Sequence, residues 1–110
     1  MKKKVRKMGE KQKFKILYSY DRMSSLKEPH FTVLKELSKD KDEFIRSKTA
    51  ALLINFESNQ SKNILMRLAQ DKDDLVRIEA YDSLKVFGLE EVEIFLQSAI
   101  CREKNYRARA

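Results

Sequence analysis

Apolar residues recur along the chain at the spacing of amphipathic helices. In the segments 43–56 and 74–87, they fall mainly three and four residues apart, so each segment presents one apolar face when helical. The residues on these faces are Ile45, Thr49, Leu52, Leu53 and Phe56 in the first segment, and Val76, Ala80, Leu84 and Phe87 in the second. Shorter helices are predicted over 29–38, 61–70 and 90–100. The pattern therefore predicts an all-α chain.

Residues typical of helix ends separate these segments. Pro29 suits the start of a helix, where its missing N–H would have no partner anyway. Asp42 and Asp73 are placed to cap the helices that follow them, and Gly88 is a good terminator. Each long segment is thus predicted to be one helix with defined ends.

A seven-residue string occurs three times, at 40–46, 71–77 and 101–107, with offsets of 31 and then 30 residues. A small residue follows the Arg of each string by three positions: Thr49, Ala80 and Ala110. The repetition predicts units of two antiparallel helices spanning about 29–58, 59–88 and 89–110, the last one truncated.

These Asp-x-x-x-x-[Ile/Val]-Arg-x-x-[Ala/Thr] strings resemble HEAT-like repeats, in the compact form typified by phycobilisome-lyase-type repeats. The resemblance covers 29–110 and implies a right-handed α-solenoid of stacked antiparallel helix pairs. It also implies a protein-protein interaction scaffold and not an enzyme. Tetratricopeptide and ankyrin repeats have similar periods, but the chain has no Trp and no Thr-Pro-Leu-His string.

The same resemblance gives the repeated Asp and Arg a structural role. In such repeats, the Asp of one unit bonds the Arg or the backbone of its neighbour, which makes a ladder along the stack. The expected ladder residues are Asp40, Arg46, Asp71, Arg77 and Arg107. The third unit departs from the pattern, because Cys101 stands where the Asp is expected.

The segment 1–28 is expected to be a basic helical segment and a possible remnant of an earlier unit. Val5 and Arg6 begin a string like those of the repeats, and apolar residues follow at helical spacing. Arg6 and Arg46 are 40 residues apart, so this alignment requires an insertion within about 20–28.

Positive charge is concentrated in the same segment. The formal net charge is +7, and residues 1–27 carry ten basic and two acidic residues, 10 − 2 = +8, which leaves −1 for the rest. The alternative function, a nucleic-acid-binding module distantly like the HEAT-like DNA glycosylases, therefore has to rest on this segment and not on the body of the chain, which weakens it. The candidate anion-binding residues are Lys2, Lys3, Lys4, Arg6 and Lys7.

The sequence offers no set of residues for catalysis, a metal or a cofactor. His30 is the single histidine and Cys101 the single cysteine, which excludes the usual zinc and disulfide patterns. No apolar run approaches the roughly 20 residues that span a membrane. We expect no enzyme activity, no cofactor, no membrane partner and a cytoplasmic location.

The surface left for a partner is the outward face of the second helices, those that follow each Asp-rich turn. Its composition is mixed, which favours a protein or peptide of unknown identity over a phosphate backbone. The candidate partner-binding residues are Ser47, Ala51, Ile54, Asn55, Ile78, Asp82 and Lys85. The alternative is that Ile54 and Ile78 pack between neighbouring second helices. Tyr81 is the aromatic residue most expected to be partly exposed.

The C-terminal unit is short of residues to cover its first helix. Leu96 and Ile100 belong to the apolar face of that helix, and only Tyr106 and Ala110 remain to pack on it. Repeat stacks normally end in a unit with a polar outer face. We expect either fraying after about Arg102 or self-association through this end.

Overall fold

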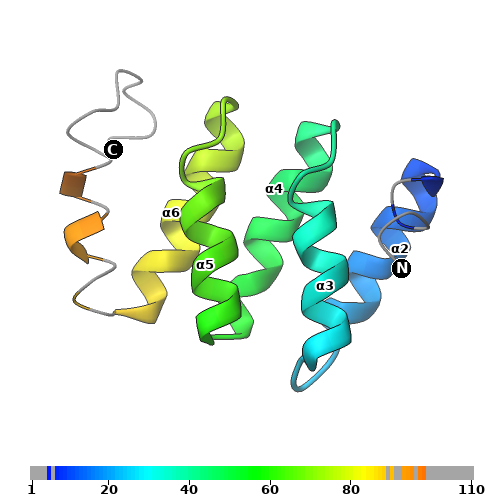
Figure 1. Cartoon of the computed structure of the whole chain (residues 1–110), viewed down its shortest axis with the longest axis horizontal. Coiled ribbons are helices and arrows are strands. Elements are labelled where there is room, and N and C mark those ends of the chain that lie inside the picture. Colours follow the sequence, from blue (N-terminus) through cyan, green and yellow to red (C-terminus); the bar gives the residue numbers. More distant parts are fainter. Residues whose placement is uncertain (1–4, 6, 89, 91–92, 96, 99–110) are drawn as a thin grey trace.

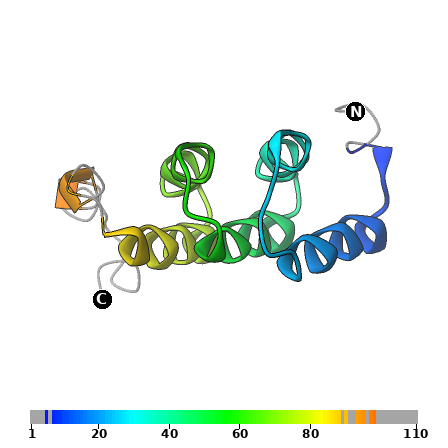
Figure 2. The same ribbon diagram turned by 90° about the horizontal axis from the view of Figure 1, so that it is seen from below.

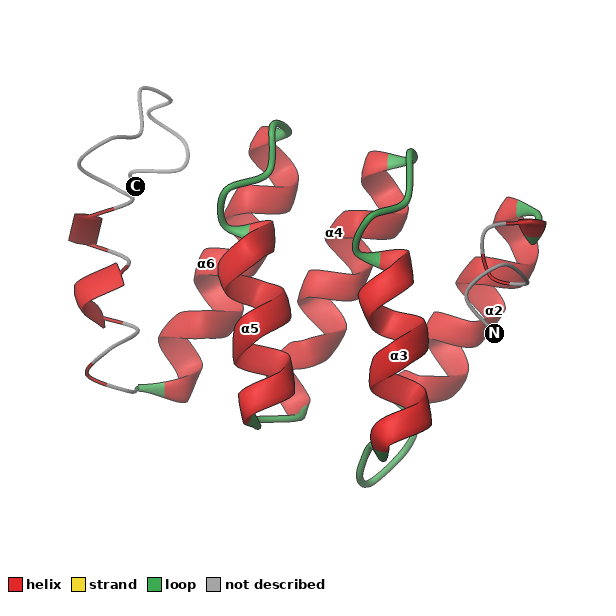
Figure 3. Cartoon of the chain, in the orientation of Figure 1, coloured by secondary structure: helices red, strands yellow, loops and turns green. Residues whose placement is uncertain are grey.

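The computed structural model describes residues 5, 7–88, 90, 93–95 and 97–98, and within this part of the chain all regular structure is helical (Figure 3). The all-α prediction is confirmed. The elements in chain order are α2 (Glu10–Asp21), α3 (Glu28–Leu37), α4 (Glu43–Leu52), the 3₁₀ turn η1 (Leu53–Asn55), α5 (Asn59–Leu68) and α6 (Asp74–Phe87).

The helices form two layers, one of first helices and one of second helices. Helices α3 and α5 lie side by side in the first layer, and α2, α4 and α6 follow one another in the second (Figures 1 and 2). Helix α4 packs against α2 on one flank and against α6 on the other. The principal extents of 38, 25 and 20 Å describe an elongated stack, as expected for an α-solenoid. Its handedness stays a prediction.

Side-chain caps begin the helices where the Asp-rich turns predicted them. Asp42 accepts from the backbone N–H of Phe44 at 2.8 Å, and Asp73 accepts from that of Leu75 at 2.9 Å. Helix α5 begins at Asn59, two residues earlier than predicted. The reason is Ser58, whose hydroxyl accepts from the N–H of Ser61 and caps the helix.

The two second helices end differently. Helix α4 changes after Leu52 to the 3₁₀ turn, which buries Leu53 and brings Phe56 back to the core. Helix α6 ends at Gly88, which has φ +63° and closes the helix in the left-handed conformation. Glycine is favoured there because it lacks a Cβ, so the predicted terminator is confirmed.

The core lies between the layers and is built from the predicted apolar faces. Every core residue predicted for 43–56 and 74–87 is buried. Each fully buried leucine or valine contributes roughly 1.5–3 kcal/mol relative to exposure. The prediction for Tyr81 was wrong: it is 4% exposed, because its ring belongs to the same core as Leu84. Between α4 and α6, the buried hydroxyl of Ser83 donates to the carbonyl of Ala50 at 2.8 Å.

Candidate functional site

A repeated polar network runs along the edge of the stack where first helices turn into second helices. Arg46 is 6% exposed and directs its guanidinium at Asp71 of the next unit. Its Nε donates to Asp71 Oδ2 at 2.9 Å and its Nη2 to Asp71 Oδ1 at 3.2 Å. This two-pronged geometry fixes both the distance and the orientation of one loop relative to the next.

Within each unit, the same Asp organises its own loop. Asp40 Oδ1 accepts from the N–H of Asp42, and Asp71 Oδ1 from that of Asp73, both at 2.9 Å. The carbonyl of Asp40 accepts from Arg46 Nη1, and that of Asp71 from Arg77 Nη1, both at 2.7 Å. The two loops therefore repeat the same hydrogen bonds, as the repeated sequence strings indicate.

Lys13 extends this network into α2, and the repeated strings did not reveal it. Its ammonium pairs with Asp40 Oδ2, and its side chain is buried. Lys13 is the fourth residue of α2, as Arg46 is the fourth of α4 and Arg77 of α6. Aligning Lys13 with Arg46 gives an offset of 33 residues, close to the offsets of 31 and 30 between the repeated strings, whereas Arg6 lies outside the described residues. The repeated string does not recur around Lys13, because Lys7 and Gln12 stand where the Asp and the Ile or Val are expected.

Part of the Arg77 guanidinium forms an ion pair within its own helix. Its Nη2 pairs with Asp74, the first residue of α6. The position that corresponds to Asp71 in the third unit is Cys101, which lies outside the described residues, as does Arg107. These bonds of Arg77 therefore hold the loop and the start of α6 together.

Close packing of the second helices leaves only part of the predicted partner face exposed. Asn55, Asp82 and Lys85 are exposed, whereas Ala51, Ile54 and Ile78 are partly buried. Ser47 is only 8% exposed, so it is less accessible than the other residues of the predicted face. Because α2 and α6 flank α4, the outward position of Ser47 lies at the floor between helices, and its hydroxyl donates to the carbonyl of Phe44.

A shallow hollow with aromatic walls, here called the aromatic depression, opens over Ser47 and Ala51. Its walls come from α2, α4 and α6 and comprise Glu10, Phe14, Phe44, Lys48 and Glu79. Phe44 is 57% exposed, and Tyr18, which stacks on Phe14 with ring centroids 6.4 Å apart, is 55% exposed. Aromatic side chains this exposed are available to a partner.

The charges around the aromatic depression are unbalanced. The pKa of Glu10 is raised, first because its carboxyl shares a hydrogen bond with that of Asp42 and then because the Asp42 charge repels it. The pKa of Glu79 is raised by burial and by the charge of Asp82, against the opposing effect of Lys48. The Lys48 ammonium lies 5.1 Å from the centre of the Tyr18 ring.

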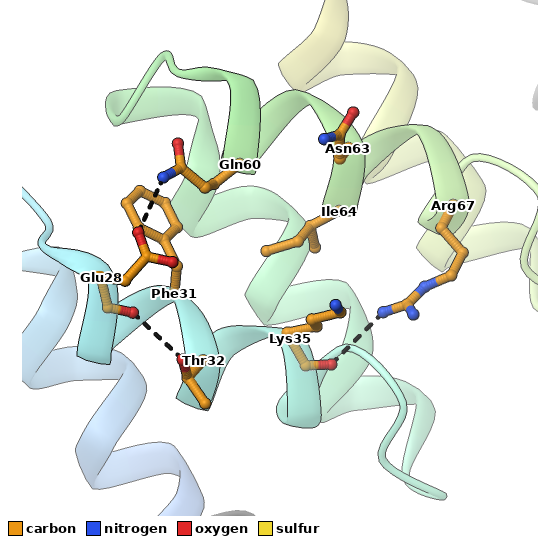
Figure 4. Close-up of a pocket in the computed structure, with 8 residues that line it drawn as sticks. All are labelled: Glu28, Phe31, Thr32, Lys35, Gln60, Asn63, Ile64 and Arg67. Atoms are coloured by element: carbon orange, nitrogen blue, oxygen red, sulfur yellow. Dashed lines mark hydrogen bonds between the residues drawn. The ribbon is translucent and has the colours of Figure 1, made fainter.

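A second groove lies on the opposite layer, between α3 and α5 (Figure 4). Its polar groups bond across it: Gln60 Nε2 donates to Glu28 Oε2 at 3.1 Å, and Arg67 donates to the carbonyl of Lys35 at 3.4 Å. Arg67 also donates to the hydroxyl of Ser38. These bonds join the first helices of successive units, so the groove is the seam between them.

A family model described as HEAT repeats matches residues 32–110, well over half of the chain. The chain belongs to the HEAT repeat family. Proteins built from HEAT repeats commonly act as protein-interaction scaffolds. Comparison with curated proteins and with solved structures gives no match.

In this HEAT-repeat chain, α2 lies outside the matched residues and still packs against α4, although less extensively than α6 does. Of the candidate anion-binding residues, Lys7 is exposed, and Lys2, Lys3, Lys4 and Arg6 lie outside the described residues. His30 Nδ1 accepts from the N–H of Lys27 at the start of α3, which gives the single histidine a structural partner.

Two further observations hold for the part of the HEAT-repeat chain that the structure describes. No group of three His, Cys, Asp or Glu side chains is placed to hold a metal ion. No helix there combines the length and the apolar character needed to cross a membrane.

Proposed function

We propose that this chain is a non-catalytic scaffold that binds a protein or peptide partner on its second-helix layer. The observation that carries the proposal is the aromatic depression. Phe44 and Tyr18 are more than half exposed beside it, and its floor is formed by the small residues Ser47 and Ala51. Interfaces are enriched in aromatic anchors, and a hollow with a small-residue floor can receive a side chain from a partner.

The neighbouring surface fits a partner that extends over more than one unit. Ile78 and Asp82 of α6 occupy the positions that Ser47 and Ala51 occupy in α4, so the face continues along the stack. Val86, near the end of α6, is 63% exposed. We propose in the same way that α2 is the second helix of an earlier unit, which makes this face three helices wide.

The polar network supports the scaffold function by making the face rigid. A binding surface loses less entropy on association when its elements are already fixed. The Arg46–Asp71 and Lys13–Asp40 pairs fix successive second helices at their N-terminal ends. The repeated Asp and Arg are therefore proposed to position the binding face without contacting the partner.

The experiment selects peptides from a random phage-displayed library on the purified chain and measures their binding to two variants. Ala51→Arg fills the aromatic depression from a partly buried position, and Asn63→Arg places the same side chain on an exposed position of the opposite layer. We expect the selected peptides to lose at least about tenfold in affinity on Ala51→Arg, the size of losing one anchor. Asn63→Arg is expected to leave binding unchanged.

Two results would contradict the proposal. One is a selection that yields no peptide able to bind the purified chain. The other is a set of peptides that bind Ala51→Arg normally and lose affinity for Asn63→Arg, which would place the binding surface on the first-helix layer. Circular dichroism and thermal unfolding of both variants control for folding.

A further inference from the structure

The aromatic depression carries two carboxyl groups at its rim and only one ammonium. Glu10 comes from the first turn of α2 and Glu79 from the second turn of α6, and Phe14 and Phe44 provide apolar walls. The chain as a whole has a net charge of +7, so an acidic rim is locally opposite to the overall charge. The depression is therefore chemically distinct from its surroundings.

The single ammonium, that of Lys48, interacts with groups on both neighbouring helices. Its Nζ lies 5.1 Å from the centre of the Tyr18 ring of α2, and its charge lowers the pKa of Glu79 of α6 against the larger effects that raise it. Glu79 comes from the helix on the other side of α4, and no side-chain hydrogen bond to it is found within the described residues. Its carboxylate thus keeps its hydrogen-bonding capacity for a ligand.

We propose that the aromatic depression receives an arginine side chain of the partner, with the guanidinium between the carboxylates of Glu10 and Glu79 and the aliphatic stem against Phe14 and Phe44. This inference rests on the proposed function and names the partner group that the depression recognises. Guanidinium suits the site because it is planar, donates in several directions and stacks on aromatic rings. A lysine would supply a compact charge without the planar stacking surface.

The electrostatics of the free protein agree with this assignment. Both rim carboxyls have a raised pKa: that of Glu10 because Asp42 shares a hydrogen bond with it and repels its charge, and that of Glu79 first because of burial and then because of the Asp82 charge. A guanidinium placed between them would relieve the repulsion that each experiences. Binding is therefore expected to depend on both carboxylates and to weaken at higher salt.

The test uses N-acetyl-arginine methylamide as the probe and follows backbone amide shifts by nuclear magnetic resonance during titration. The matched control probe is the citrulline derivative, which has nearly the same shape and no charge. We expect saturable shifts around Phe44 and Ala51 with the arginine probe, and none with citrulline. Glu79→Gln and Glu10→Gln are each expected to weaken arginine binding by at least about threefold, as for partly exposed ion pairs.

The control variant is Glu57→Gln, which changes a carboxylate outside the depression and should leave binding unchanged. Equal shifts with arginine and citrulline, or arginine shifts centred elsewhere, would overturn the inference. So would normal binding by Glu79→Gln and Glu10→Gln. Such a failure leaves the proposed function intact if selected peptides without arginine still require the space above Ala51. If no selected peptide bound the chain at all, both the arginine inference and the proposed function would be wrong.

Discussion

Arg46 uses its guanidinium on two loops at once. Nε and Nη2 hold the Asp71 carboxylate of the next unit, and Nη1 holds the carbonyl of Asp40 in its own unit. The side chains of Arg46 and Asp71 are 8% and 12% exposed, so water can form few hydrogen bonds to either group if the pair is broken. A buried pair of this kind is costly to break from one side, because the remaining charge stays buried without its partner.

The first prediction is that Arg46→Ala lowers the free energy of unfolding by roughly 3 kcal/mol, since it leaves the Asp71 carboxylate without its guanidinium. Urea unfolding followed by circular dichroism measures the change. Lys35→Ala removes an exposed cation of α3 and is expected to change stability by less than about 0.5 kcal/mol.

A double-mutant cycle with Asp71→Ala separates the pair from other effects of truncation. The coupling energy between Arg46 and Asp71 is expected to exceed about 1 kcal/mol. Additive effects of the two substitutions would show that the pair does not couple the units, whatever the size of each effect.

At the scale of the element, the helix ends show which parts of the fold can be predicted from the sequence. The caps at Asp42 and Asp73 and the terminator at Gly88 were predicted from local residue types, because each acts within its own turn. Ser58 was missed as a cap because it stands in a run of polar residues, any of which could begin a helix.

Longer-range features were harder to predict. The burial of Ser47 depends on how closely neighbouring second helices pack. The hydrophobic periodicity of one helix predicts which face is apolar, but it does not predict the distance to the next helix. Lys13 was missed because its equivalence to Arg46 is a matter of position in the helix and not of residue identity. The aromatic depression needs three helices, α2, α4 and α6, so no single segment of sequence displays it.

The second prediction concerns the end of α6. Gly88→Ala should lower the free energy of unfolding by about 1–2 kcal/mol, because an alanine at this positive φ is strained. Apart from the adjacent backbone, no described atom lies within 4 Å of the position a Cβ would take, so the cost comes from the local backbone conformation and not from a clash with packed neighbours. Urea unfolding with linear extrapolation measures it.

The matched control is Gly9→Ser at the start of α2. Gly9 has φ −72°, which any residue adopts, and there is also no atom within 4 Å of its added Cβ. Serine at this cap is expected to stabilise by a few tenths of a kcal/mol. The two glycine substitutions should therefore have opposite signs, and a shared sign would refute the conformational account.

For the whole molecule, the uneven distribution of charge separates two kinds of binding. The excess positive charge belongs to residues 1–27, and the aromatic depression has an acidic rim. Binding to a polyanion through the N-terminal segment would be sequence-independent and sensitive to salt, because it releases counterions. Binding of a peptide in the depression would be selective and would not require Lys2, Lys3 or Lys4, which do not line it.

The third prediction is that replacing Lys2, Lys3 and Lys4 together by Ala weakens any binding to duplex DNA. The slope of log affinity against log salt should become shallower by about 0.9 for each phosphate that these lysines neutralise in the unsubstituted chain. Fluorescence anisotropy with a labelled duplex at several salt concentrations measures this. Peptide binding by the same variant is the control and should not change. Tight, sequence-selective DNA binding by the substituted chain would favour the nucleic-acid function over the scaffold.

The Arg46–Asp71 bond also has a direction. The donor belongs to the earlier unit and the acceptor to the later one, as Lys13 and Asp40 show again one step before. A unit with an Asp in its loop and a cation in the first turn of its second helix therefore fits its neighbours on both sides. Such an ion pair between units lets a gene gain or lose whole units by duplication or deletion. Each new neighbour already carries the Asp or the cation that completes the pair.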